Sequence, residues 1–412
     1  MLYKHKEENT LKHKTVGSAS RSRTTLLALF GLAMLALLAP AVGSAAKKKP
    51  KKDASATVMT RNVYLGADLG PAINAPDTCG AIDAGGQILN DVDASDFPAR
   101  AKLLAQEIKK SKADLVGLQE LALWRVQEDS DFSATDATEV RYDFLQLLLD
   151  ELKAAGSEYT VAVVQDEFDQ ELPADTDNSN ATQDASFPLC GADIDGRLTM
   201  RDAIIVKKGS KVKVSNPEMG HFTNRYSVVL GGVVPVNVDR GWVSVDAKVK
   251  GSKKTRSAKF HFVNSHLEAF GDPAIREAQA RELFAEGGPL QTKSDLVFVG
   301  DINSGSPEDK IGPPFTTAGD EGAYNALEGD YGLINLGARQ TCCYPGTDAA
   351  TIGDYRLDHT VDHIMVKPKL KSKIKQKKSK VTGADPTVVT PSGQVSSDHG
   401  GLWSQLQFKK KK

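Results

Sequence analysis

Four short polar clusters each follow an apolar, β-branched run, and a fifth cluster lies near the C-terminus. The runs cover 56–59, 115–118, 260–263 and 296–299. Such runs are typical of buried strands. The clusters are Arg61-Asn62, Gln119-Glu120, Asn264-Ser265-His266, Gly300-Asp301-Ile302-Asn303 and Ser397-Asp398-His399. Carboxylates, amides and imidazoles gathered at strand ends suit a hard divalent cation and a phosphate ester.

Strand and helix patterns alternate along the chain without internal repeats, which indicates an α/β sandwich. Residues 54–408 are predicted to form a single domain. Two polar insertions, at about 66–97 and about 166–197, are predicted to be loops. The predicted helices cover 97–108, about 139–154 and 274–286. The predicted strands cover 56–63, 114–119, 159–164, 202–206, 212–214, 242–249, 260–264, 296–300, 362–366 and 403–408.

Taken in chain order, these motifs resemble the endonuclease/exonuclease/phosphatase superfamily, in a secreted bacterial branch. The resemblance rests on Asn62, Glu120, Asn-x-His at 264–266, Gly-Asp-x-Asn at 300–303, Asp362 and Ser-Asp-His at 397–399. It spans roughly residues 56–408. It implies a four-layer, deoxyribonuclease-I-like fold, in which two packed β-sheets are flanked by helices and the site lies at one sheet edge.

The resemblance implies a role for each residue of the motifs. Metal-binding positions are Glu120, Asn62 and Asp398. Catalytic positions are His399, Asp301, His266, Asp362 and Asn303. In this scheme Asp362 orients His399, and Asp301 orients or deprotonates the attacking water.

Substrate contacts are implied for Asn303 and His266, and Asp202, which opens a predicted strand, is a further candidate. The neighbouring pair Asp358-His359 has the same composition as a catalytic pair, but no apolar strand follows it directly. The sequence departs from the family pattern before Asp362, where the common arginine is displaced to Arg356. It also has Gly401 where a proline is common after Ser-Asp-His-Gly.

These motifs predict a Mg²⁺-dependent phosphodiester hydrolase, with Mn²⁺ or Ca²⁺ as alternative ions, acting as a monomer on a phosphate ester. A nuclease is favoured by the frequency of nucleases in the superfamily and by the lysine stretches. The alternatives are a sphingomyelinase-like or phospholipase-C-like enzyme that binds a phospholipid headgroup, and a phosphomonoesterase. A non-catalytic binding protein on the same scaffold is a further hypothesis, which the full set of site residues opposes.

The first 46 residues have the pattern of a secretory signal peptide, which predicts a secreted protein. A basic segment precedes the apolar run 26–38, and small residues follow at 41–46. No later apolar run is long enough to span a membrane, so the mature chain is expected to lack a transmembrane segment. A lysine-rich linker at 47–53 would lead into the domain.

Charge is unevenly distributed. The formal net charge is −1, yet seventeen lysines lie in the three short stretches 47–52, 367–380 and 409–412. The rest of the mature chain is therefore strongly acidic, which argues against a broad cationic face for duplex nucleic acid. Lysines at alternate positions of 367–377 predict an edge strand protected from aggregation. Contact with an anionic surface is the alternative interpretation, and 409–412 would form a basic tail.

The chain has four cysteines, Cys79, Cys190, Cys342 and Cys343. Export permits disulfides, and the sequence leaves all three connectivities open. No cysteine spacing matches a zinc site. The acidic segment 175–180 has some features of a calcium loop but lacks the glycine and glutamate that such a loop needs, so a solvated loop is predicted.

Overall fold

A computed structural model describes residues 51–128, 130, 135–177, 190–306, 320–337 and 340–411. The predicted signal peptide, most of the linker, the middle of the acidic insertion and the last lysine of the tail lie outside these residues. Contacts group Pro50–Lys412 as one compact unit. Among the described residues, no helix is long and apolar enough to cross a membrane.

The first sheet has eight strands in the order β15-β16-β1-β2-β6-β3-β4, with β5 also paired to β6. Strand β1 runs parallel to β2 and antiparallel to β16, so the ends of β1 and β2 lie beside the start of β16. The strands are β1 (Ala54–Asn62), β2 (Leu115–Gln119), β3 (Leu123–Glu128), β4 (Glu139–Asp143), β5 (Tyr159–Ala174), β6 (Ile194–Lys207), β15 (Ser372–Thr382) and β16 (Gly401–Lys410).

The second sheet has six strands in the order β13-β14-β12-β11-β10-β7. Strands β11 and β12 are parallel, and β14 runs antiparallel to β12. The strands are β7 (Val212–His221), β10 (Gly241–Val249), β11 (Ala258–His266), β12 (Asp295–Asp301), β13 (Ile334–Asn335) and β14 (Asp362–Lys367). A separate hairpin consists of β8 (Tyr226–Leu230) and β9 (Val234–Val238).

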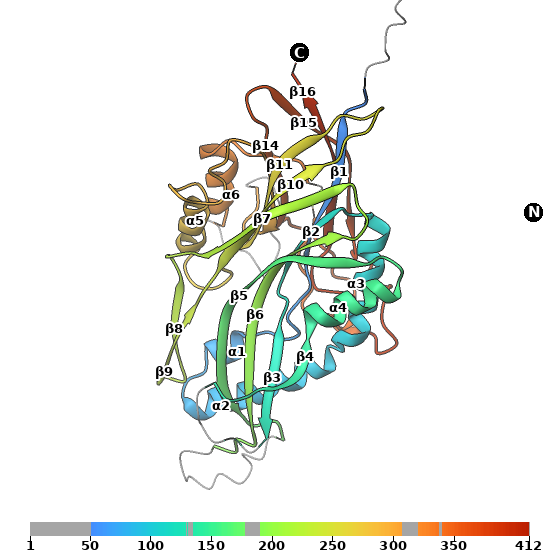
Figure 1. Cartoon of the computed structure of the whole chain (residues 1–412). Helices are drawn as coiled ribbons and strands as arrows, with labels where there is room; N and C mark the ends of the chain where they lie inside the picture. The colour runs from blue at the N-terminus through green and yellow to red at the C-terminus, as the bar shows by residue number, and fades with distance from the viewer. Residues whose placement is uncertain are drawn as a thin grey trace, which may run out of the picture. The chain divides into compact units, whose positions relative to one another are not determined.

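Three apolar cores define four layers (Figure 1). One core lies between the two sheets and includes Val58, Phe262 and Leu402. A second joins the outer face of the first sheet to α2 (Thr78–Ala94), α3 (Phe97–Ser111) and α4 (Phe144–Ala154). A third joins the second sheet to α5 (Pro273–Glu282), α6 (Gly322–Asn325) and the π-helix η2 (Ala326–Asp330). The predicted α/β sandwich of two sheets flanked by helices is confirmed. Two further one-turn helices are α1 (Gly70–Ile73) and α7 (Ala349–Ile352).

Helix α3 forms where the sequence predicts it, because local signals mark both of its ends. The Asp96 side chain accepts a hydrogen bond from the Ala99 amide at the N-terminus, and Pro98 lies in the first turn. Lys109 and Lys110 occupy the last turn, where cations interact favourably with the helix dipole. The face carrying Leu104 is buried against the first sheet.

The prediction that 66–97 is a loop is wrong, because α2 occupies 78–94 of it. Glycine and aspartate lower intrinsic helix propensity, and the segment is rich in both. The fold requires a glycine at Gly86, since a Cβ there would lie 1.6 Å from the Asp175 carbonyl oxygen. Burial of Ile88 and Leu89 and the Cys79–Cys190 disulfide also hold the helix in place. Tertiary packing therefore overrides local propensity here.

Two other predictions need correction. Residues 139–143 form β4 rather than the start of a helix, and the helix begins at Phe144. Strand β5 continues to residue 174 and β6 begins at residue 194, so strand occupies 166–174 and 194–197 of the insertion predicted at 166–197. The two long strands pair along their length, and this pairing is a long-range effect that local composition does not reveal. Residues 178–180 of the calcium-like segment lie outside the described part.

The predicted edge strand is confirmed in part. Lys373, Lys375 and Lys377 lie on β15, the edge strand of the first sheet, whereas Lys367 ends β14 and Lys369 and Lys371 lie in the turn between the two strands. Ser372 and Ile374 point inward, while Lys373 and Lys375 are exposed. Charged side chains on an edge strand oppose pairing with another chain.

Candidate active site

The five polar clusters meet at one end of the seam between the two sheets. Strands β1, β2, β11 and β12 end there, and the antiparallel strands β14 and β16 begin there. Asp301 lies opposite His266 on one side and opposite Asp362 on the other. The Asn62 amide joins the sheets, since Nδ2 donates to Glu120 Oε1 at 2.8 Å and to Asp301 Oδ2 at 3.1 Å.

Two of the site residues adopt left-handed backbone conformations, which residues other than glycine rarely adopt. The φ angle is 59° at Glu120 and 47° at Asn303. Glu120 Oε2 accepts a hydrogen bond from the Leu65 amide at 2.8 Å, and Asp301 Oδ1 accepts one from the Asn303 amide at 2.9 Å. Such backbone strain is common at functional sites, where the surrounding structure enforces it.

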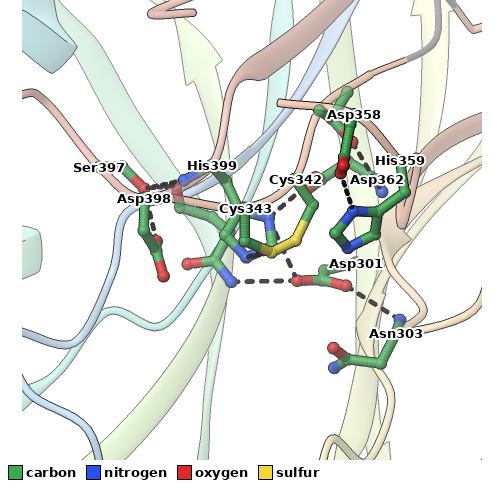
Figure 2. The surroundings of a disulfide bond; sticks show 12 residues. Asp301, Asn303, Cys342, Cys343, Asp358, His359, Asp362, Ser397, Asp398 and His399 are labelled. Atoms are coloured by element: carbon green, nitrogen blue, oxygen red, sulfur yellow. Dashed lines mark hydrogen bonds and ion pairs between the residues drawn. A yellow bond between two sulfur atoms is a disulfide. The ribbon is translucent and has the colours of Figure 1, made fainter. Parts of the chain in front are cut away.

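His399 is buried and paired with Asp362. Its Nδ1 lies 2.9 Å from Asp362 Oδ2 and 3.7 Å from Asp301 Oδ2 (Figure 2). Burial by itself lowers the pKa of His399, but the carboxylates of Asp362, Asp398 and Asp301 together raise this pKa well above its usual value. This shift favours the imidazolium form, and Nε2 is the nitrogen that faces away from Asp362.

His266 is held in the opposite protonation state by Arg240. An Arg240 Nη1 lies 3.1 Å from His266 Nδ1. A guanidinium only donates hydrogen bonds, so Nδ1 accepts and the ring proton resides on Nε2. Burial, followed by the charges of Arg240 and His399, lowers the pKa of His266 well below its usual value. Nε2 lies 3.8 Å from Asp301 Oδ2 and 3.2 Å from Asn303 Nδ2.

Asp398 lies beside this cluster on the loop that precedes β16. The Ser397 hydroxyl donates to the Asn62 carbonyl at 2.9 Å and lies 3.3 Å from Asp398 Oδ1, which fixes the loop against β1. Burial and the charge of Glu120, partly offset by His399, raise the pKa of Asp398 to about 7. Glu120 and Asp398 are therefore close enough to repel each other.

The donor set fits a hard cation. Burial and the Asp362 charge raise the pKa of Asp301, and burial raises that of Asp398, so these two carboxyls would be stabilised in their ionised form by a nearby cation. Asp362 Oδ1 is buried and has no hydrogen-bond partner among the described residues. Ligand atoms of Asp301, Asp362 and His399 lie within 4.8 Å of one another. Oxygen-rich sites of this kind are typical of Mg²⁺, Mn²⁺ and Ca²⁺.

Asp202 lies behind the site rather than on its surface. It is fully buried on β6, where burial raises its pKa well above the usual value despite the charge of Arg240. Glu167 is buried nearby, and burial and the Asp202 charge raise its pKa as well. Arg240 also lies 3.6 Å from Glu268 Oε1. Arg240 is thus the cation shared by three buried carboxylates, and it connects them to His266.

The disulfide between Cys342 and Cys343 lies against His399 (Figure 2). The two Sγ atoms are 3.8 and 3.6 Å from Nε2. The disulfide therefore forms a wall beside the nitrogen that is free of Asp362. The second disulfide, Cys79–Cys190, joins α2 to the segment before β6.

The competing pair Asp358-His359 lies beside the Cys342–Cys343 disulfide, where the His359 backbone pairs with Cys342 (Figure 2). His359 Nδ1 contacts the adjacent Asp358 at 2.7 Å, and the Asp358 side chain is 51% exposed. The structure therefore gathers Asn62, Glu120, His266, Asp301, Asn303, Asp362, Asp398 and His399, as the order of motifs predicts. Sequence reasoning missed Arg240, Glu167 and Glu268, and it left the Cys342–Cys343 disulfide as one of three possible connectivities. Arg240 belongs to Asp239-Arg240-Gly241, which directly precedes the predicted strand 242–249. A charged residue next to a predicted strand was therefore the sequence signal that could have identified it.

No family model and no curated protein sequence matches the chain. Solved structures do. An endonuclease/exonuclease/phosphatase family protein from Bacteroides thetaiotaomicron has 15% sequence identity and a TM-score of 0.48, covering 87% of this chain and 99% of its own. A mannosyl-6-phosphatase from the same species has 16% identity and a TM-score of 0.48, covering 85% and 99%. D. rerio TDP2, complexed with a single-strand DNA product, has 15% identity and a TM-score of 0.45, covering 87% and 100%. Because every TM-score here is below 0.5, function is argued from the site of this chain.

Proposed function

We propose that this chain is an exported, metal-dependent phosphoester hydrolase of the endonuclease/exonuclease/phosphatase family, with nucleic acid as the first substrate to test. The observation that carries the proposal is the pair of histidines on either side of Asp301. His399 pairs with Asp362, which favours the imidazolium, and His266 faces Arg240, which favours a neutral imidazole with its proton on Nε2. One phosphate placed between them would meet two different donors.

Each of the chain's own groups has a chemical task in this scheme. The raised pKa of Asp301 suits it to accept the proton of the attacking water. His266 would donate from Nε2 to a non-bridging phosphoryl oxygen, and Asn303 would bind the same group. His399 would donate its Nε2 proton to the leaving oxygen, while Asp362 keeps the ring oriented.

Glu120, Asn62 and Asp398 are the residues that would hold the ion. Bound Mg²⁺ would supply a Lewis acid that neutralises the phosphoryl charge. Proton transfer in the scheme depends on Asp301 and His399, so ion removal and His399 substitution test separate parts of the site.

The first test is hydrolysis of supercoiled plasmid and of bis(p-nitrophenyl) phosphate with Mg²⁺, with EDTA, and with His399→Ala. The proposal expects turnover of the small diester that needs both Mg²⁺ and His399. Asp358→Asn, at a carboxylate whose side chain is 51% exposed and contacts the adjacent His359, is the matched control and should retain activity. Turnover that survives His399→Ala, or a folded wild type without turnover, would contradict the proposal. Diester turnover without plasmid nicking would contradict only the nuclease part.

An ester with an apolar group is a second candidate substrate, because an apolar pocket lies beside Arg240. This pocket has a volume of about 110 Å³ and is lined by side chains of α1, α2, β5, β6 and the β8–β9 hairpin. Trp124, Phe168 and Met200 contribute to it, and Arg240 is its charged lining residue. Release of phosphocholine from sphingomyelin or phosphatidylcholine vesicles would favour this candidate over nucleic acid.

Export is part of the proposal and rests on the pattern of residues 1–46. Expression of the full chain in a bacterial host should release a processed protein into the periplasm or the medium. Retention of the unprocessed chain in the membrane fraction would contradict export as a free protein.

A further inference from the structure

A lysine-rich groove lies at the end of the sandwich opposite the candidate active site. Its volume is about 1240 Å³. Cationic side chains from four separate segments line it, namely residue 51, residues 248–259, residues 369–371 and residues 409–411. We call this feature the lysine groove. The fold thus collects lysine stretches that are more than 300 residues apart in the sequence.

The strands themselves separate the lysine groove from the active site. Strands β1, β11 and β12 begin at the groove and end at site residues. Strands β14 and β16 begin at the site and end at the groove. Nine residues of β1 span roughly 30 Å at about 3.3 Å per residue. Figure 1 shows the start of β15 and the end of β16 beside the start of β1, away from α2 and β3. The groove is therefore a separate site and not an extension of the active site.

The cations of the groove are poorly compensated within the chain. Among the described residues, Lys409 with Asp53, at 3.8 Å, is the one ion pair that involves a groove lysine. The acid on the groove lining, Asp295, is buried and accepts hydrogen bonds from the Ser372 hydroxyl and the Lys369 amide. The groove therefore presents almost entirely positive charge.

Two pairs of lysines face each other directly across strands. Lys248 on β10 lies opposite Lys259 on β11, and Lys373 on β15 lies opposite Lys409 on β16. Like charges directly opposite each other destabilise a sheet. An anionic partner bound across these strands would offset the repulsion.

An exposed leucine beside the groove indicates that the partner of the groove offers an apolar region as well as negative charge. Leu370 is 86% exposed in the turn between β14 and β15, and it lies between Lys369 and Lys371. The aromatic residue of the groove, Phe408, is buried and unavailable for stacking on bases. Single-stranded nucleic acids usually require such stacking, whereas lysines around an apolar side chain suit a membrane interface.

We propose that the lysine groove docks this protein on an anionic lipid surface, with Leu370 entering the headgroup region. Clustered lysines are attracted to anionic headgroups, and their contributions add within a Debye length of the surface. Docked in this way, the protein holds its active site roughly 30 Å from the lipid. The substrate of a docked molecule is then a soluble ester and not a lipid of the same membrane.

The test measures partition of the full chain onto vesicles of phosphatidylcholine with and without phosphatidylglycerol, at low and high salt. The phosphatidylcholine arm measures any binding by the apolar segment 26–38. Phosphatidylglycerol should raise the partition coefficient at least about tenfold, and high salt should remove this gain. Equal partition onto both kinds of vesicle would overturn the proposal.

Two charge-reversed variants with matched charge localise the effect. The groove variant should lose about a hundredfold in partition onto phosphatidylglycerol vesicles. The control variant, altered on exposed positions of α3 and α4, should lose less than about threefold because those lysines lie away from the groove. Similar losses in both variants would overturn the proposal. The groove variant is Lys248→Glu/Lys371→Glu/Lys410→Glu, and the control variant is Lys102→Glu/Lys110→Glu/Lys153→Glu.

Two further measurements keep the proposal testable if the groove variant fails to fold. Leu370→Ser changes no charge and should lower partition onto phosphatidylglycerol vesicles several-fold. A short DNA duplex should displace the protein from vesicles only weakly. Tighter binding to the duplex than to the vesicles would identify the groove as a nucleic-acid site and overturn the membrane proposal.

Discussion

The two ends of the sandwich are built by the same strands but follow opposite physical rules. At the active-site end, polar side chains are buried and bonded to one another, as in Asn62 to Asp301 and His399 to Asp362. At the groove end, lysines such as Lys248 and Lys259 are exposed and face like charges. At the active-site end, charged groups are held by partners within the protein. At the groove end, lysines that face like charges can be neutralised by a bound anion.

The difference shows that charged groups serve two purposes in one fold, namely to shift each other's pKa and to bind an external partner. Buried groups shift each other's pKa and are largely unaffected by salt, because solvent does not screen them. Salt weakens the attraction of the exposed lysines for a partner. We therefore expect substitutions at the active-site end to change catalysis and its pH dependence, and substitutions at the groove end to change salt-dependent binding.

Asp362→Asn should have the largest effect on catalysis. The amide cannot supply the negative charge that raises the pKa of His399, so less of the imidazolium is present at neutral pH. We expect kcat on a small diester to fall about 10²-fold or more, with unchanged partition onto vesicles. Asp358→Asn is the matched control. Equal kcat values for the two variants would show that Asp362 has no role in catalysis.

Arg240→Gln should change the pH dependence of kcat more than its maximum. Glutamine still donates a hydrogen bond to His266 Nδ1 but removes one of the charges that lower the pKa of His266. This pKa should rise, so His266 would gain a second proton at a higher pH. The acid limb of the pH profile should therefore move to higher pH, with kcat a few-fold lower there. An unmoved acid limb would show that Arg240 has only a structural role.

Lys259→Glu should stabilise the fold slightly, which is the opposite of what substitution at the active-site end does. It places opposite charges directly across β10 and β11, next to Lys248. The expected gain in the free energy of unfolding is about 0.2–1 kcal/mol, measured as a higher midpoint in urea at low salt. Lys375→Glu, whose cross-strand partner is Gln407, is the control and should give no such gain. A midpoint that falls for Lys259→Glu would mean that Lys248 and Lys259 do not repel.

The smallest effect expected is that of the groove on catalysis. The charge-reversed groove variant should retain kcat/KM on a small soluble diester within about twofold, because roughly 30 Å separates the two ends and the Debye length is about 8 Å. A change well beyond this would show that the two ends are coupled. It would also contradict the view that the two ends of the sandwich act independently.

The lysine stretches also illustrate how distant segments change a sequence-based argument. In the sequence, the lysine stretches favoured a nuclease because they could have contacted a nucleic-acid substrate. The structure places 369–371 and 409–411 at the far end from His399. They therefore give no support to a nucleic-acid substrate at the active site, and the nuclease part of the proposal depends on direct tests.

The sequence by itself determined the buried central strands, the sandwich and most members of the candidate active site. Apolar runs and the polar residues that end them are local patterns, and strand ends such as Asn62 and Asp301 must lie at a sheet edge. Tertiary structure alone decided the rest. Helix α2 forms against its own local propensity because Gly86 packs on the end of β5. Arg240 reaches His266, and Cys342 and Cys343 reach His399, through contacts between distant segments. Such contacts depend on how the layers pack, and local pattern does not encode them.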